Sequence, residues 1–177
     1  YHIIDSEGNV VKEVEGFTFE NSLELLEKWK IHNVPCGSGS GMIVRRGCFD
    51  SVGLFDESLE SAEDRDMWFR IGKLFNAYII KEPLVQIRSH ANNMHKNISR
   101  MKNNQKTFIK KNLGEEKWVI KRKAYGYVYL DAAHEYYALS NRCAAFANAM
   151  ASICYYPFRV SPGDDKYKLL LKTIINY

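Results

Sequence analysis

Residues 63–75 read Glu-Asp-Arg-Asp-Met-Trp-Phe-Arg-Ile-Gly-Lys-Leu-Phe, and their apolar side chains recur with the period of an α-helix. The side chains that share the apolar face are Met67, Trp68, Ile71, Leu74 and Phe75. Two acidic residues, Glu63 and Asp64, stand first, where the positive end of a helix dipole stabilises carboxylates. We therefore expect a helix that begins near this acidic pair and buries its apolar face.

Upstream of this helix we expect a hairpin and then a capped helix. Residues 1–4 and 10–11 are largely apolar and flank the turn-forming segment 5–9. Asn21 and Glu24 have the three-residue spacing of a capping box, which marks the start of a helix.

The stretch between the two helices combines glycines with a short apolar run. The Gly-Ser-Gly-Ser-Gly segment 37–41 leads into Met-Ile-Val at 42–44, which predicts a buried strand stopped by two arginines. Residues 48–52 predict one helical turn ended by Gly53.

Downstream, the pattern predicts two more strands and then helices alone. Residues 78–80 and 84–87 have strand character on either side of a Glu-Pro break, and 89–97 is a polar loop. From about residue 99 the expected helices are 99–112, 116–139, 141–156 and 165–176. Alanine-rich faces permit close helix approach and indicate an antiparallel helical hairpin. We expect a domain boundary near residue 98, which separates domain 1–98 from domain 99–177.

The composition is that of a globular protein. Of 177 residues, 46% are hydrophobic and 26% charged, which excludes disordered, collagenous and disulfide-scaffold classes. No apolar run has the length of a membrane span, no secretory signal is visible, and the four cysteines form no CxxC pair. These features predict a cytoplasmic chain, with peripheral contact at the inner face of the membrane as an option. Because the sequence begins with Tyr1, we expect a processed product or a fragment.

Positive charge is concentrated in one part of the chain. Residues 100–123 carry nine basic and two acidic side chains, whereas 1–99 carry 11 basic and 15 acidic ones. A solvated helix face, a nucleic-acid site and a patch on anionic lipid would all have this pattern. The aromatic residues do not interleave with these charges as stacking platforms require, so the solvated face is favoured.

Three groups of residues could carry chemistry, and each has a structural alternative. Glu63 and Asp64 at a helix start suit a general base, although acidic residues also cap helices. His90 follows a predicted strand and could ligate a divalent metal, or it could be an ordinary surface histidine. The small residues Gly39 and Gly41 leave room for a sugar or diphosphate, or simply open a packed strand.

The order of four motifs resembles a known enzyme family. The motifs are Val34-Pro-Cys-Gly-Ser-Gly-Ser-Gly-Met-Ile-Val-Arg-Arg46, Val52-Gly-Leu-Phe-Asp-Glu-Ser-Leu59, Glu63-Asp-Arg-Asp-Met-Trp-Phe-Arg70 and Glu82-Pro-Leu-Val-Gln-Ile-Arg-Ser-His90. This series resembles the second half of the catalytic domain of family-two inverting glycosyltransferases with the GT-A fold. The resemblance covers residues 1–95 and implies an α/β or α+β fold, a partial GT-A-like mixed sheet with helices, followed by an α-helical C-terminal extension.

The resemblance implies roles for individual residues. Asp64 would be the base that deprotonates the acceptor hydroxyl, with Glu63 beside it, and His90 would help to bind the metal on the donor diphosphate. Gly39, Gly41 and Arg88 would line the substrate site. Three further residues would support the site: Trp68 and Arg70 by packing the helix and bracing the site, and Asp56 by ordering its loop.

The resemblance also implies a missing part. The family's donor-binding half, with a DxD motif that holds Mg²⁺ or Mn²⁺, is not found in these residues. The isolated chain is therefore expected to be inactive and not to bind the metal alone, and an exposed sheet edge could make it a homodimer. The parent enzyme would use a nucleotide-sugar donor and a glycan or lipid-linked acceptor in polysaccharide synthesis, with no specific nucleic acid.

Two other classes stay open. The helices of 99–177 could form a protein-interaction module, or the basic helices could bind nucleic acid or acidic lipid.

Overall fold

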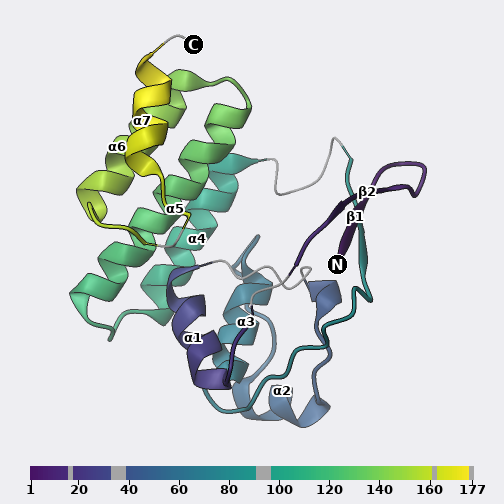
Figure 1. The fold of residues 1–177 in the computed structure, drawn as a ribbon. Helices are drawn as coiled ribbons and strands as arrows, with labels where there is room; N and C mark the ends of the chain where they lie inside the picture. Colours follow the sequence, from purple (N-terminus) through teal and green to yellow (C-terminus); the bar gives the residue numbers. More distant parts are fainter. Residues whose placement is uncertain (16–17, 33–38, 91–96, 161–162, 176–177) are drawn as a thin grey trace. The chain divides into compact units, whose positions relative to one another are not determined.

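A computed structural model describes residues 1–15, 18–32, 39–90, 97–160 and 163–175. The chain forms two compact units (Figure 1). Unit 1 comprises residues 1–29 and 33–96, and unit 2 comprises residues 30–32 and 97–177. That each is a domain, with the boundary at residue 98, stays a prediction.

Unit 1 contains a small mixed sheet. Its strands are β1 (His2–Ile4), β2 (Val10–Glu13) and β3 (Gln86–Arg88), in the order β2-β1-β3. β1 pairs antiparallel with β2 and parallel with β3. The hairpin turn is closed by the Asp5 carboxylate, which accepts hydrogen bonds from the Glu7 and Asn9 N–H groups at 2.9 Å. The predicted hairpin and mixed sheet are confirmed.

The helices of unit 1 follow the sequence signals closely. They are α1 (Ser22–Ile31), the 3₁₀ helix η1 (Gly39–Gly41), α2 (Arg46–Val52) and α3 (Glu63–Gly72). The capping box that opens α1 is formed, because Asn21 Oδ1 accepts from the Glu24 N–H at 3.0 Å. Gly53 ends α2 with a φ of 79°, a conformation that favours glycine.

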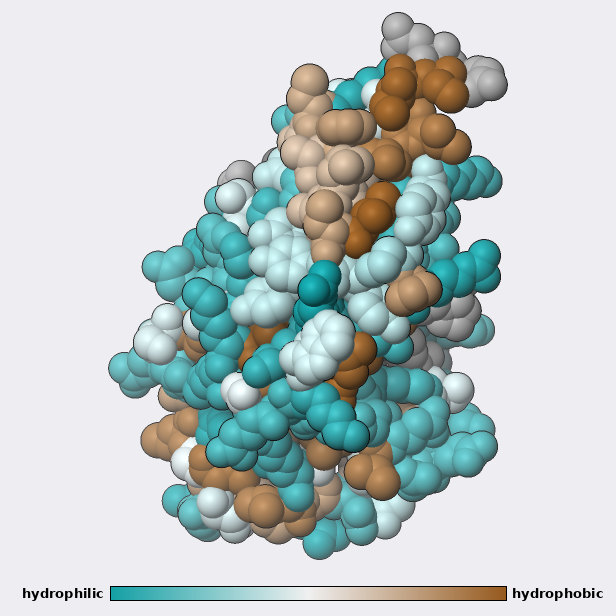
Figure 2. All heavy atoms as spheres, turned by 90° about the vertical axis from the view of Figure 1, so that its left-hand side faces the viewer, coloured by the Kyte–Doolittle hydropathy of each residue, from teal (hydrophilic) through white to brown (hydrophobic). Residues whose placement is uncertain are grey.

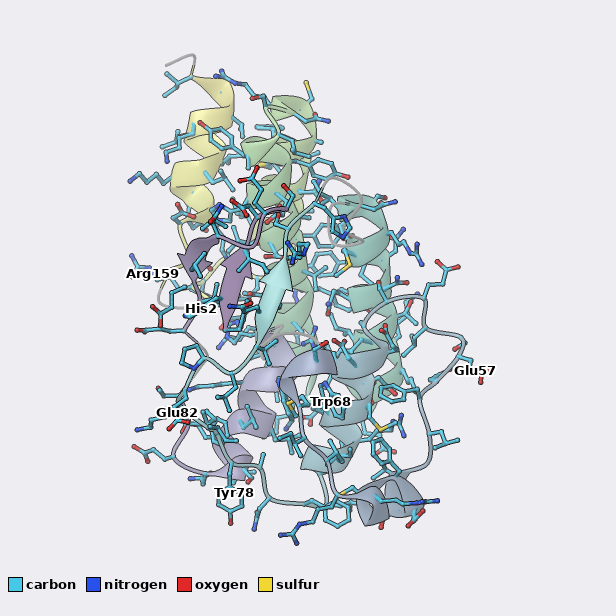
Figure 3. All side chains as sticks on the ribbon, turned by 90° about the vertical axis from the view of Figure 1, so that its right-hand side faces the viewer. His2, Glu57, Trp68, Tyr78, Glu82 and Arg159 are labelled. Carbon is cyan, nitrogen blue, oxygen red and sulfur yellow. The ribbon has the colours of Figure 1, made fainter. Side chains whose placement is uncertain are left out.

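Two predicted strands are wrong. Residues 42–44 and 78–80 have no strand structure, and Ile43 and Tyr78 are 92% and 89% exposed (Figure 3). A strand needs a neighbour that supplies its hydrogen bonds, and among the described residues none pairs with either segment. The third strand begins later than predicted, at Gln86, because the chain turns where the Leu84 N–H bonds to the Glu82 carbonyl.

The secondary-structure elements in the described residues of unit 2 are all helices, as predicted. Its helices are α4 (Ile98–Asn112), α5 (Trp118–Ala138), α6 (Arg142–Tyr155) and α7 (Lys166–Ile174). The alanines buried on α5 and α6 are Ala124, Ala132, Ala133, Ala145 and Ala149. They let α5 and α6 pack side by side across a three-residue connection, which confirms the helical hairpin (Figure 1). None of the helices in the described ranges is long and apolar enough to cross a bilayer.

At Gly126, helix α5 approaches the C-terminal end of α6 closely. The Ser152 hydroxyl donates to the Gly126 carbonyl at 2.7 Å, and a Cβ on this glycine would lie 3.0 Å from Cβ of Tyr156. Gly126→Ala is therefore expected to destabilise the protein by about 1–3 kcal/mol, even though alanine is the better helix former by about 1 kcal/mol. Denaturant unfolding followed by circular dichroism measures the change.

Gly47→Ala provides the matched control for Gly126→Ala. Gly47 lies in α2, and a Cβ there would meet no atom within 4 Å. Gly47→Ala is expected to leave the free energy of unfolding unchanged or to raise it, because the substitution changes only the helix propensity of the residue. Equal effects of the two substitutions would show that the close approach at Gly126 is not needed.

Candidate functional site

The predicted acidic pair lies at the start of α3 behind an unusual backbone conformation. Ala62, which precedes Glu63, has a φ of 66° in the left-handed region and no side-chain cap. Its carbonyl accepts the Asp66 N–H at 3.0 Å, so the turn is closed although it is strained for alanine. The residue before it, Ser61, is buried as well. The fold therefore fixes the place where the helix and its carboxylates begin.

The third carboxylate of the first turn, Asp66, has a structural role. Asp66 is fully buried and accepts a hydrogen bond from Arg70 Nε at 2.9 Å. The Arg70 guanidinium also donates to the carbonyls of Val52 at 2.6 Å and Leu54 at 2.9 Å. Arg70 thus ties α3 to the last residue of α2 and to Leu54 just beyond it, while its role in bracing a site stays a prediction.

Glu63 and Asp64 are in a different environment from Asp66. Both are half-buried. Oδ1 of Asp64 accepts the Arg65 N–H at 2.6 Å, and no side chain in the described ranges donates to either carboxylate. Asp64 therefore has an oriented carboxylate with acceptor positions left over, at the positive end of a helix dipole. This is the arrangement that a general base needs.

Trp68, labelled in Figure 3, belongs to α3 and lies four residues after Asp64, a spacing that puts both on one face of a helix. The indole is buried and packs edge-on against Phe55, with ring centroids 5.9 Å apart, as the predicted packing role requires. Its Nε1 has no hydrogen-bond partner among the described residues. A donor that has lost water without gaining a partner is uncommon, and nothing in the sequence pattern indicated it.

The loop before α3 is ordered by its own side chains. Asp56 Oδ1 accepts from the N–H of Ser58 at 3.0 Å and from its hydroxyl at 2.6 Å, and the Leu59 N–H bonds to the Asp56 carbonyl. Leu59 is buried. The predicted ordering role of Asp56 is confirmed.

Arg88 is the last residue of β3, and His90 follows the strand two residues later. Arg88 Nη1 donates to the carbonyls of Asp5 and Ser6, both at 2.8 Å, so part of this guanidinium holds the hairpin turn. His90 follows the strand and is exposed. No group of three or more His, Cys, Asp or Glu side chains that could hold a metal is found within the described ranges. Metal binding by His90 and substrate binding by Arg88 stay predictions.

The glycines Gly39 and Gly41 lie in η1 and are exposed. They do not open a packed strand, since residues 42–44 form none. A Cβ on Gly39 would meet no atom within 4 Å, so open space surrounds it. Gly37 lies outside the described residues, and the predicted substrate role of Gly39 and Gly41 stays a prediction.

The basic stretch of 100–123 is largely engaged within unit 2. Lys102 Nζ bonds to Asn148 Oδ1 at 2.8 Å and lies 5.4 Å from the ring centroid of Tyr129. Arg122 donates to the carbonyls of Cys154 and Tyr155, both at 2.6 Å, and so satisfies the end of α6. These contacts favour a structural role for the charges over a nucleic-acid site.

Comparison with known proteins relates the chain to glycosyltransferases. It is 26% identical over 163 residues to an uncharacterized glycosyltransferase of Rickettsia bellii, covering 81% of this chain and 22% of the relative. It is 36% identical over 53 residues to an uncharacterized glycosyltransferase of Rickettsia prowazekii, covering 30% of this chain and 17% of that relative. The chain thus spans about a fifth of the length of these relatives. No protein-family model and no solved structure matches.

The strain at Ala62 gives a stability prediction. Ala62→Gly is expected to change the free energy of unfolding by less than about 1 kcal/mol, because glycine escapes the Cβ penalty of the left-handed conformation but loses a buried methyl group. Denaturant unfolding measures it. Ala147→Gly, at an exposed position inside α6, is the control and should lose about 1 kcal/mol. A loss at Ala62 larger than the loss at Ala147 would mean that relief of backbone strain does not offset the buried methyl group.

Proposed function

We propose that this chain is the acceptor-side half of a family-two inverting glycosyltransferase with the GT-A fold. Its relation to glycosyltransferases and the order of its four motifs support the proposal. The observation that carries it is the half-buried Asp64 carboxylate, held by a single backbone N–H at the start of α3.

In the proposed reaction Asp64 acts as the general base. Oδ1 is held by the Arg65 N–H, and Oδ2 takes the proton of the acceptor hydroxyl. The acceptor oxygen forms a bond to the anomeric carbon of the donor sugar as the bond from that carbon to the diphosphate breaks. The nucleoside diphosphate leaves with the electron pair, and the anomeric configuration inverts. Glu63 lies beside the base in the first turn of the same helix.

The donor side is proposed to lie outside this chain. Asp64-Arg65-Asp66 has the letters of a DxD motif, but Asp66 is fully buried on Arg70 and is not available to a metal. Mg²⁺ or Mn²⁺, when bound by the donor half, would stabilise the charge on the leaving diphosphate. His90 is the residue of this chain that would add a ligand. Gly39, Gly41 and Arg88 would contact the substrates, with a glycan or lipid-linked acceptor.

A transfer assay tests the proposal. Residues 1–177 alone and a longer protein that contains them are incubated with a set of nucleotide-sugars, Mn²⁺ and candidate glycan acceptors. We expect release of nucleoside diphosphate and a new glycosidic bond from the longer protein and none from 1–177. Turnover by 1–177 alone would show that the donor site lies within the chain. No turnover by the longer protein with any donor would count against a transferase.

A further inference from the structure

Helix α7 exposes one apolar and cationic face. Leu169 is buried in the core of unit 2, together with Leu130, Ala133, Ala149 and Val160. The exposed residues are Tyr167, Lys168, Leu171, Lys172, Ile174 and Ile175. Tyr167, Leu171 and Ile174 follow one another at helical spacing, and Leu171 and Ile174 are 57% and 62% exposed. Large aliphatic side chains are thus in water on the outside of a packed helix.

The neighbouring helix α6 extends this apolar face. Its exposed residues include Cys143, Phe146, Ala147 and Met150, none of which is charged. α6 and α7 pack against each other, and Figure 2 shows a continuous apolar surface over both at the upper end of the view. Contiguous exposed apolar patches of this kind mark interaction sites in soluble domains.

The charges on this surface have one sign. Neither α6 nor α7 contains an aspartate or glutamate, whereas Lys168 and Lys172 lie beside the apolar residues of α7. Of the acidic residues just before α7, Asp164 pairs with Lys166 Nζ at 2.9 Å. Asp165 Oδ1 lies 2.9 Å from His134 Nε2, and this contact is an ion pair only when the histidine is protonated. The exposed face of α7 therefore combines aliphatic side chains and an aromatic ring with two lysines and no acidic residue of the same helix.

We propose that the α6–α7 face docks on a bilayer surface that contains anionic lipids. α7 lies along the surface, Tyr167, Leu171, Ile174 and Ile175 enter the boundary between headgroups and acyl chains, and the two lysines pair with lipid phosphates. Lysine is depleted in protein–protein interfaces, so lysines between the aliphatic residues favour a lipid partner. The buried Leu169 and the Asp164–Lys166 pair keep α7 folded before it binds. Binding therefore does not have to offset the entropy cost of forming the helix. This inference does not depend on the transferase reaction.

Sedimentation with vesicles tests the proposal on the full chain. Wild-type protein should bind phosphatidylcholine vesicles that contain phosphatidylglycerol, and bind weakly to phosphatidylcholine alone or at high salt. Leu171→Ser/Ile174→Ser should reduce the partition coefficient at least about tenfold. Lys168→Gln/Lys172→Gln should reduce it about fivefold for each lysine.

Two control variants match these changes elsewhere in unit 2. Trp118→Ser removes an exposed apolar side chain from the start of α5, and Lys110→Gln/Lys117→Gln removes two exposed lysines. Both should bind vesicles as the wild type does. Circular dichroism checks the fold of each variant. If Leu171→Ser/Ile174→Ser is unfolded, the vesicle binding of Lys168→Gln/Lys172→Gln decides the test.

Two results would overturn the proposal. One is the absence of wild-type binding to the anionic vesicles, or equal loss in the control variants. The other is a wild-type dimer in light scattering that Leu171→Ser/Ile174→Ser abolishes while vesicle binding stays unchanged, since the face would then join two copies of the chain.

Discussion

Asp64→Asn is expected to lower kcat for sugar transfer by the longer protein by about 10³-fold, within the range that general bases contribute. The amide keeps the size of the carboxylate and can still accept the Arg65 N–H, but it cannot take the proton of the acceptor hydroxyl. KM for both substrates should change little, because the lost interaction belongs to the transition state. Initial rates over a range of donor and acceptor concentrations separate the two parameters.

Glu63→Gln is the matched control for this change. It removes a carboxylate from the adjacent position of the same helix turn and should cost less than about tenfold, since Glu63 does not take the proton in the proposed reaction. Both variants should unfold at the same denaturant concentration as the wild type. If Asp64→Asn kept most of its activity while Glu63→Gln lost it, the roles of the two residues would have to be exchanged.

Asp164→Ala is expected to have the largest effect on stability, about 3–5 kcal/mol, because it leaves a buried ammonium without its counter-ion. The side chains of Asp164 and Lys166 are each 1% exposed, and Lys166 Nζ lies 2.9 Å from Asp164 Oδ2. Lys166 Nζ also donates to the carbonyls of Tyr156 and Phe158, both at 2.8 Å, and Asp164 accepts the Val160 N–H. The pair thus fixes the connection between α6 and α7, and denaturant unfolding of unit 2 measures its loss.

The double variant Asp164→Asn/Lys166→Met is the control for the charge argument. It removes both charges and nearly preserves volume, so it should lose much less stability than Asp164→Ala. An equal loss in both variants would mean that packing and the backbone hydrogen bonds, and not the unpaired ammonium, set the cost.

The same pair predicts a loss of stability in acid. Burial raises the pKa of Asp164, but the hydrogen bond from Lys166 and the N–H groups of Val160 and Lys166 outweigh it and hold the pKa below its ordinary value. A lowered pKa in the folded state contributes stability that is complete above the unfolded value of about 3.9. This contribution is lost as the pH falls through the folded pKa. Unfolding at pH 7, 5, 4 and 3 should show a decline below about pH 4 that is smaller in Asp164→Asn, because the lowered pKa values of Asp5 and Glu24 also contribute to it.

Elements whose formation depends on residues close together in the sequence could be predicted. Asn21, Asn97 and Asn141 each precede a helix, and each side chain accepts a backbone N–H of the first turn. The hairpin likewise depends on residues close in sequence, because two largely apolar segments flank the turn-forming residues 5–9. Helix positions in unit 2 follow for this reason.

Features that depend on distant partners could not be predicted. Residues 42–44 and 78–80 have strand composition, but strand structure also needs a neighbour, and composition does not show one. At the candidate site, the sequence Glu63-Asp64-Arg65-Asp66 does not show which carboxylate is buried. In the structure Asp66 is buried and pairs with Arg70, whereas Asp64 is half-buried. The left-handed Ala62 and the unpartnered indole N–H of Trp68 leave no mark in the sequence.

The stereochemistry of transfer tests the central claim most directly. Proton NMR of the first product formed by the longer protein gives the anomeric configuration of the new linkage. Direct attack by an acceptor that Asp64 deprotonates predicts a configuration opposite to that of the nucleotide-sugar donor. A product with the donor's configuration would contradict the assignment of Asp64 as the base of an inverting transfer.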